Sequence, residues 1–441
     1  MSPTSRIQTR LEKAARGWLV DEVPAAEPEW LSRRRSTARE YFEQRGIPTI
    51  RQEDFRFFPL TGITSEALHA VSRAQVDMTL GRPEWAAAAC IGFVNGQPIG
   101  LLDSLPIGLR IELLSEVLNT APNALEPYLG NLAVPNNGFA AVGLSLFRDA
   151  WVVRVAEGAC IELPLDIVIQ QRGGGQWAIP RLLVVMESGS QLKLIERRVS
   201  DDSSNVDLTT GVFEIFLGER AQLQHVCLCS RGGKDTELTA TAVRVAANGH
   251  YHAWTATNKG MLTRFDTHVH LAGDGARADL DGLYVASQRD IIDHHTRVVH
   301  ASENTTVEES YKGIVDDQAQ AVFDGQIVVQ PGAMGTKAQQ YNRNLLMSDH
   351  AVVHTKPQLE IDADDVACSH GATVGKLDEQ QLFYLQSRGI SGEQAKRMLT
   401  TAFAAEVLDR CPVKQVAQFL TGFMTTLSLD TERLFGDVKP G

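Results

Sequence analysis

Short apolar runs fill the middle of the chain, and no helical period interrupts them between about Phe139 and Leu377. Each run is rich in β-branched residues and is bounded by turn residues, which predicts a strand. Roughly 240 residues of strand and turn is too much for a simple sandwich. Stacked rungs bury a core that no single rung can bury, so the pattern favours a parallel β-helix and a double-sheet jelly roll about equally. The main runs lie at 151–155, 167–171, 182–186, 192–197, 211–217, 222–229, 239–245, 251–256, 267–271, 279–285, 321–329, 339–347 and 352–361.

The N-terminal part, 1–135, has a different pattern. Helical spacing predicts a first helix with apolar positions at Ile7, Leu11, Ala14, Ala15, Trp18 and Leu19. A second helix covers 30–46 and stops at Arg45-Gly46. Beyond it, a strand at 89–94 is closed by the Asn95-Gly96 turn, and a helical piece covers 111–118. We expect an α+β region that precedes a β core at 136–376.

The C-terminal part, 377–441, returns to helical spacing. Asp378 can cap a first helix, and Ser391 with Gln394 forms a capping box for a second. Pro412 suits the first turn of a third helix. The apolar residues expected to turn inward are Leu382, Phe383 and Leu385 in the first helix and Val416, Leu420, Phe423 and Leu427 in the third. We expect these helices to cap the end of the β core.

Composition and charge narrow the class of protein. The chain has 43% hydrophobic and 22% charged residues, as ordinary globular proteins do. A net charge of −12 argues against nucleic acid or an anionic membrane surface as a partner. Six scattered cysteines are too few for a disulfide framework in 441 residues. No secretory signal core or membrane span is evident, so we expect a cytoplasmic protein with reduced thiols.

The first candidate for metal chemistry is Cys368-Ser369-His370. Residues i and i+2 of a strand share one face, so Cys368 and His370 project together. Thiolate and imidazole suit iron, copper, zinc or an iron–sulfur cluster. Two ligands do not complete a four-coordinate site, so the remaining ligands would come from a partner chain.

Two rival sites contain histidine. His225, Cys227 and Cys229 share one strand face, but side chains roughly 6.6 Å apart would strain to reach one ion. Buried core cysteines are the simpler interpretation. His268-Val269-His270 resembles the His-x-His of cupin metal enzymes, although the glutamate that such enzymes need does not follow.

Several catalytic motifs are absent. The sequence has no G-x-x-x-x-G-K-[ST] nucleotide loop, because GAMGTK at 332–337 has the wrong spacing. It also lacks a G-x-G-x-x-G fingerprint and a G-x-S-x-G elbow. Any nucleotide energy would therefore come from another subunit.

Two stretches resemble the SufB/SufD family, the scaffold proteins of the SUF iron–sulfur cluster assembly system. They are AVFDGQIVVQPGAMGTKAQQYNRNLLMS at 321–348 and DVACSHGATVGKLDEQQLFYLQSRGIS at 365–391. The resemblance is closest to SufD and is clearest over 281–408. It implies a right-handed parallel β-helix, which decides between the two folds left open above. It also implies a scaffold and not an enzyme.

The resemblance implies partners and a cargo as well. It implies a SufB-like subunit joined by extending one sheet into the other, with the strands near 352–374 as the edge, and a homodimer when the chain is alone. It implies that the helical tail docks a SufC-like ATPase, for which we single out Phe383, Leu399 and Phe403. His370, with Cys368 beside it, would hold iron or a transient iron–sulfur cluster together with a cysteine of SufB, and no cofactor would bind the lone chain tightly.

Two departures separate the sequence from SufB. SufB-like sequences have glutamate where this chain has Gly371, and a cysteine within the stretch that reads Tyr-Asn-Arg-Asn at 341–344. A chain that has neither this glutamate nor this cysteine would depend on SufB for the thiolate. The alternative function is a cupin-like, metal-dependent enzyme using His268 and His270, which would retain tightly bound metal.

Overall fold

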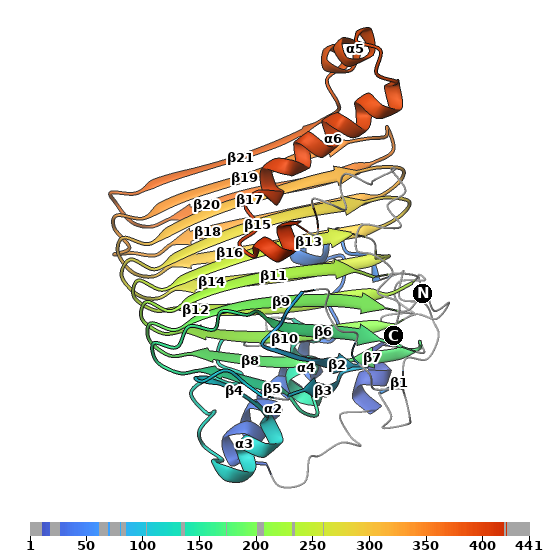
Figure 1. Cartoon of the computed structure of the whole chain (residues 1–441). Coiled ribbons are helices and arrows are strands. Elements are labelled where there is room, and N and C mark those ends of the chain that lie inside the picture. Colours follow the sequence, from blue (N-terminus) through green and yellow to red (C-terminus); the bar gives the residue numbers. More distant parts are fainter. Residues whose placement is uncertain are drawn as a thin grey trace.

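The chain forms a long parallel β-solenoid with helical regions at both ends (Figure 1). The computed structural model describes residues 11–17, 27–60, 69–70, 80, 85–102, 104–133, 137–172, 174–200, 207–231, 234–258, 260–418 and 420. The chain alternates between two sheets, so that from β8 and β9 onward each strand pairs in parallel with the strand two places further along the chain. The jelly roll, whose strands are antiparallel, is therefore excluded.

The first sheet, called sheet A, contains β4 (Leu109–Leu113), β5 (Trp151–Val155), β8 (Arg181–Met186), β10 (Leu208–Leu217), β12 (Thr236–Val245), β14 (Leu262–Leu271), β16 (Ile291–His300), β18 (Gln320–Val329) and β20 (Val352–Ile361), with β7 (Gln176–Ala178) and β1 (His69–Ala70) at its margin. The second, sheet B, contains β3 (Gln97–Leu101), β2 (Ala89–Val94), β6 (Leu165–Gln171), β9 (Gln191–Ser200), β11 (Gln222–Ser230), β13 (His250–Asn258), β15 (Arg277–Ala286), β17 (Thr306–Val315), β19 (Lys337–Leu346) and β21 (Ala367–Gly375).

Tight corners join sheet A to sheet B. Asn248 lies at the corner between β12 and β13, Asn304 at the corner between β16 and β17, and Asp365 at the corner between β20 and β21. Their φ angles are 53°, 55° and 54°. Asparagine and aspartate tolerate this left-handed conformation better than other non-glycine residues. A short corner of fixed geometry keeps the strands in register, so that equivalent side chains of neighbouring rungs lie one above another.

The interior of the solenoid, which we call the lumen, has two halves. The ends of the sheet A strands and the starts of the sheet B strands contribute the apolar half, including Ile215, Val243, Leu280 and Ile327. The residues from the fourth position onward in sheet B strands such as β11, β17 and β19, together with the starts of the sheet A strands, contribute the polar half. In β15 the fourth residue, Leu280, still belongs to the apolar half and pairs in register with Glu309. The buried inward residues of the polar half include Glu196, Arg198, His225, Glu237, His294, Glu309, Gln340 and Asn342. Strand alternation places all of these on the inward face.

The N-terminal end of the solenoid is closed by its own chain. Antiparallel strands β3 and β4 flank the parallel rungs, and α2 (Glu29–Arg45), α3 (Leu114–Thr120) and α4 (Gly138–Leu146) pack beside them. The indole of Trp151 donates to the Gly92 carbonyl at 2.9 Å inside the closed end. The strand at 89–94, its Asn95-Gly96 turn and the helix stop at Gly46 are confirmed.

Two predictions in this region are wrong. Residues 111–113 belong to β4, because they pair with β5 before the helix begins at Leu114. Residues 138–146 form helix α4, although no helical period was expected after about residue 139. Asn137 caps α4 by accepting from the backbone N–H groups of Phe139 and Ala140, and the helix is apolar nearly all round because it is almost fully buried.

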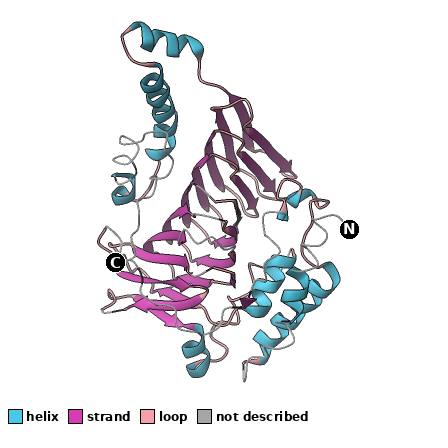
Figure 2. Cartoon of the chain, turned by 90° about the vertical axis from the view of Figure 1, so that its right-hand side faces the viewer, coloured by secondary structure: helices cyan, strands magenta, loops and turns pink. Residues whose placement is uncertain are grey.

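Among the described residues, the C-terminal helices leave the other end of the solenoid uncovered. After β21, α5 (Glu379–Ser387) extends past the last rung, and α6 (Gly392–Leu408) runs back along the outer face of sheet B (Figures 1 and 2). The Trp254 indole donates to the Val407 carbonyl at 2.8 Å, which ties α6 to β13. The predicted cap is therefore wrong: α6 covers the side of the solenoid, where β15 and β17 lie beneath it.

The remaining predictions for the two ends are partly testable. Residues 11–17 are helical, Leu11 and Ala15 are buried, and Val416 and Leu420 pack with α6 against sheet B. Ile7, Trp18, Leu19, Phe423 and Leu427 lie outside the described residues. Among the described residues, no helix is both long enough and apolar enough to cross a membrane.

Candidate functional site at the open end of the solenoid

The last rung, β20 and β21, exposes side chains that every earlier rung buries. Ile361 and Val374 point into the lumen, because they pair in register with the buried residues Val329 and Asn344. They are nevertheless 41% and 45% exposed. At the closed end, Ile111 of the outermost strand β4 is 6% exposed. The interior of the solenoid therefore opens to solvent at β20 and β21.

The two predicted ligands lie on this last rung and share its inward face. Cys368 pairs with Ala338 and His370 pairs with Gln340, and both of those partners are fully buried. Cys368 packs against the apolar core, and burial raises the pKa of its thiol, opposed by a backbone hydrogen bond involving Ala338. His370 is exposed at the end of the polar half. The two side chains therefore have different environments.

Gly371 does not lie beside the imidazole of His370. A Cβ at Gly371 would lie 3.5 Å from the ring of Tyr341, on the outer face of sheet B. Strand alternation puts His370 on the opposite face. A larger residue at 371 would therefore meet Tyr341 at an ordinary contact distance and would leave the imidazole undisturbed.

Polar side chains continue into the lumen beneath His370. Gln340 Nε2 donates to Glu309 at 2.6 Å, and Asn342 Nδ2 lies 3.0 Å from the Tyr284 hydroxyl, which donates to Asn344 at 2.5 Å. Burial raises the pKa of Glu309 to about 7, opposed by hydrogen bonds from Gln340 and Thr296. Sequence reasoning missed this group, although the run KAQQYNRNLL of β19 is unusually polar for an inner strand.

The His225, Cys227 and Cys229 group also faces the lumen, in its middle. His225 Nδ1 lies 3.0 Å from the Tyr251 hydroxyl, and its Nε2 lies 3.1 Å from Glu196. Burial raises the pKa of the Cys227 thiol well above its ordinary value and that of Cys229 to about 12. Neutral thiols are poor ligands and nucleophiles. In the described part of the chain, no group of three or more His, Cys, Asp and Glu side chains is placed to hold a metal ion.

His268 and His270 lie on the outer face of β14, because Val269 between them is part of the core. Burial lowers the pKa of His268, opposed by the charge of Asp266. Asp266 is itself bound by Arg264 at 2.8 Å. In the part of the chain that the structure describes, neither histidine belongs to a group of three or more His, Cys, Asp and Glu side chains placed to hold a metal ion.

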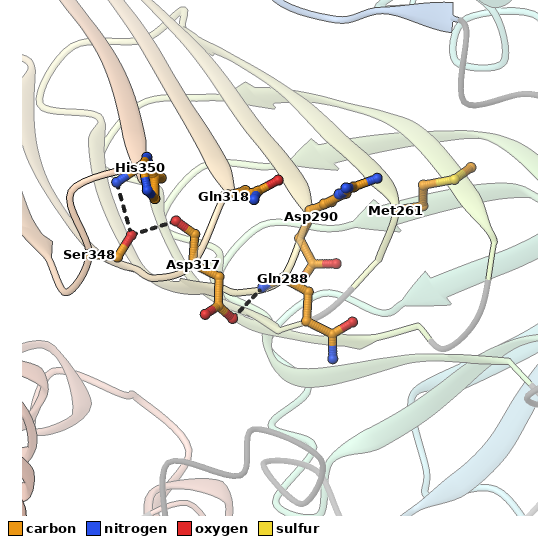
Figure 3. A pocket seen from close by; sticks show the side chains of 8 residues that line it. Met261, Gln288, Asp290, Asp317, Gln318, Ser348 and His350 are labelled. Atoms are coloured by element: carbon orange, nitrogen blue, oxygen red, sulfur yellow. Dashed lines mark hydrogen bonds between the residues drawn. The ribbon is translucent and has the colours of Figure 1, made fainter.

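A second concave site lies at the corners that join sheet B to sheet A, with a volume of about 580 Å³ (Figure 3). The backbone N–H of Gln288 donates to Asp317 at 2.9 Å, and that of His350 donates to Ser348 Oγ at 3.2 Å. Ser348 Oγ in turn donates to the Asp317 carbonyl. These contacts tie one turn to the next, so the hollow is lined by structural hydrogen bonds.

The predicted docking residues lie in different environments. Phe383 on α5 is 71% exposed, so the prediction that it turns inward is wrong. Phe403 on α6 packs against its own chain: Lys312 Nζ lies 4.6 Å from its ring and donates to its carbonyl at 2.7 Å. Leu399 is half-buried on the same helix. Among the described residues of the tail, the exposed large apolar side chains are Phe383 and Tyr384 on α5 and Met398 on α6.

Comparison with known proteins identifies the family. The profile of the SUF system FeS cluster assembly SufBD core domain matches residues 168–403, which span β6 to α6. The protein ABCI7, chloroplastic, of Arabidopsis thaliana is 29% identical over 88% of this chain and 84% of its own length. The iron-sulfur cluster assembly protein SufD of Escherichia coli is 29% identical over 82% of this chain and 85% of its own length. The chain therefore belongs to the SufB/SufD family of the SUF iron–sulfur cluster assembly system.

Proposed function

We propose that this chain is a SufD-like, non-enzymatic scaffold subunit that pairs with a SufB-like subunit through the open end of its solenoid. The observation that carries the proposal is the contrast between the two ends. The chain closes one end with its own strands and helices, whereas β20 and β21 leave inward apolar residues and strand edges uncovered. Uncovered edges pair readily with strands of another chain.

The two free edges differ, and the difference favours β21. The Ala367 N–H donates back to β19, at the Thr336 carbonyl, so alternation points the N–H groups of 368, 370, 372 and 374 towards the free edge. The Val352 N–H donates back towards β18, at the Ala319 carbonyl, so the odd positions of β20 face outward. Pro357 is one of them and lacks a donor. A partner strand therefore finds its complete set of donors along β21.

The direct test places proline on that edge. Ala372→Pro removes an outward N–H without removing a hydrogen bond to β19, so it should weaken binding of a SufB-like subunit and spare the fold. Ala372→Thr keeps the N–H and serves as the matched control. Both are compared by co-purification and by thermal melting. Unchanged binding of the proline variant would place the interface elsewhere.

The cargo of such a complex is iron or a nascent iron–sulfur cluster. His370 presents at the open end an imidazole nitrogen of the kind that iron accepts, whereas the thiol of Cys368 on the same face packs against the apolar core. One imidazole leaves the coordination incomplete, and a partner facing the same opening would supply the other ligands. Loading therefore belongs to the assembled complex, and the isolated chain would use the same edge to pair with a second copy.

The tail would dock the ATPase. Phe383 and Tyr384 of α5 extend beyond the solenoid, where they contact no core of their own chain. An exposed aromatic pair on a short helix is typical of the anchors that bury at a protein interface. Because α6 is packed on sheet B and α5 is not, we assign the SufC-like contact to α5.

A further inference from the structure

Three side chains form a column in the polar half of the lumen, directly beneath the open end. Glu309 of β17 pairs in register with Gln340 of β19, and Gln340 pairs with His370 of β21. All three face inward, and neighbouring strands are about 4.8 Å apart. The exposed imidazole therefore stands over the Gln340 amide, and the amide stands over the Glu309 carboxyl.

The Gln340 amide is fully buried, and only one of its two ends has a partner. Its Nε2 donates to Glu309 at 2.6 Å. Its Oε1 is buried and accepts no hydrogen bond from any described residue. A buried carbonyl oxygen that accepts no hydrogen bond lowers the stability of the fold, so such atoms are rare in folded proteins and often belong to functional sites. Because Nε2 is turned towards Glu309, Oε1 is the end left for the next rung.

Close packing against Gly325 and the environment of Glu309 restrict the amide further. Gly325, on the facing strand β18, lies so close that a Cβ there would collide with Gln340 Nε2. Glu309 is buried, and among the described residues it receives the hydrogen bond from Gln340 and forms no ion pair with a lysine, arginine or histidine. The ionised form of the carboxyl only accepts hydrogen bonds, and the hydrogen bond from Gln340 favours that form, so the carboxylate selects Nε2 as the end of the amide that faces it.

We propose that Gln340, oriented by Glu309, is a positioning residue for His370, and that its free Oε1 accepts a hydrogen bond from one ring N–H of the imidazole. A neutral imidazole has one N–H and one lone pair. If Oε1 takes the N–H, the lone pair of the other ring nitrogen faces out of the open end, where a partner would present the cargo. An acceptor behind a ligating histidine fixes its tautomer and raises its basicity.

The role of this hydrogen bond in presenting cargo rests on the function proposed above. The hydrogen bond between the His370 ring and Gln340 Oε1 does not depend on that function. Among the described residues, none hydrogen-bonds the His370 ring in this structure, and strand pairing places His370 directly above Gln340. The column can therefore be tested in the isolated chain, without partner or cargo.

The test is the tautomer of His370 in the isolated chain, measured at neutral pH from the ring ¹⁵N chemical shifts of histidine-labelled protein. His370→Ala assigns the signals. In the wild-type chain we expect one tautomer to predominate. Gln340→Met keeps the size of the side chain and removes the acceptor, and it should return the ring to a mixture. Gln340→Glu restores an acceptor oxygen and should restore the bias.

Glu309→Gln provides a second variant if Gln340→Met does not fold, and it should weaken the bias because either end of Gln340 can then face it. Ring shifts that are identical in wild type, Gln340→Met and Glu309→Gln would overturn the proposal.

In the co-expressed complex, Gln340→Met should lower cluster formation about 10-fold at unchanged melting temperature. If Gln340 sets the tautomer but His370→Ala forms clusters normally, the column stands and the proposed function fails. If His370→Ala loses clusters but Gln340→Met changes neither tautomer nor clusters, the column fails and the function stands.

Discussion

The two ends of the solenoid are built from the same repeat, but the chain covers one end and leaves the other exposed. At the closed end, β3, β4 and helices α2 to α4 cover the first rungs, and Trp151 fills the lumen at 5% exposure. At the open end, Val374 points into the same lumen and is 45% exposed. Each rung buries its face against the next one, so an uncovered last rung is an incomplete core. The difference indicates where a second protein would complete the structure.

The largest expected effect comes from emptying the closed end. Trp151→Ala should reduce the free energy of unfolding by about 3–5 kcal/mol, because a fully packed indole and its hydrogen bond to Gly92 are lost. Val374→Ala at the open end should cost less than about 1 kcal/mol, because its side chain is half exposed already. Urea unfolding of the two variants gives both values. Equal losses would mean that the open end is covered in the isolated chain.

The polar half at the open end should give the protein a distinctive pH dependence. Burial raises the pKa of Glu309 from 4.5 to about 7, so the folded state holds a proton that the unfolded state has released within that window. The stability contributed by the neutral carboxyl is therefore present at low pH and lost as pH rises through 7. Relative to Glu309→Gln, the wild type should lose up to about 3 kcal/mol between pH 4.5 and 7.5. If the free energies of unfolding of the wild type and Glu309→Gln change in parallel with pH over this range, the pKa of Glu309 is not raised by burial.

A substitution on the exposed face of α5 should have a small effect on stability and a large effect on binding of the ATPase. Phe383→Asp should lower the affinity for a SufC-like ATPase at least 10-fold and change the free energy of unfolding by less than about 0.5 kcal/mol, because the ring is 71% exposed. Phe403→Ala is the contrasting variant, since its ring packs over Lys312 and its loss should destabilise the chain. Titration calorimetry and thermal melting separate the two effects. Normal binding by Phe383→Asp would remove α5 as the dock.

The sequence predicted the strands better than their surroundings. β2 and β5 match their predicted bounds, because alternation and turn residues are local signals. α4 was missed, since a helix that is buried on all sides has the continuous apolar pattern of an inner strand. Helical spacing identified α6 but not the face of the solenoid on which it packs, which depends on sheet B residues such as Trp254, far away in the sequence.

The candidate site was predictable in part for a similar reason. The spacing of Cys368 and His370 predicts a shared face, and their register with Ala338 and Gln340 confirms it. The exposure of that face was not predictable, because it depends on β21 being the last rung. Gln340 and Glu309 lie 30 and 61 residues upstream of His370, and only the stacking of rungs brings them beneath it.

The central claim is that His370, at the end of the polar half, contacts the cargo, whereas Cys368 is mainly a packed thiol. The most direct measurement compares His370→Ala, Cys368→Ala and the outer-face control His268→Ala in the co-expressed complex, scored by cluster absorbance and thermal melting. We predict that His370→Ala lowers cluster formation at least 10-fold at an unchanged melting temperature, and that the other two retain most of it. Normal cluster formation by His370→Ala, or a loss that follows only from dissociation of the complex, would contradict the account.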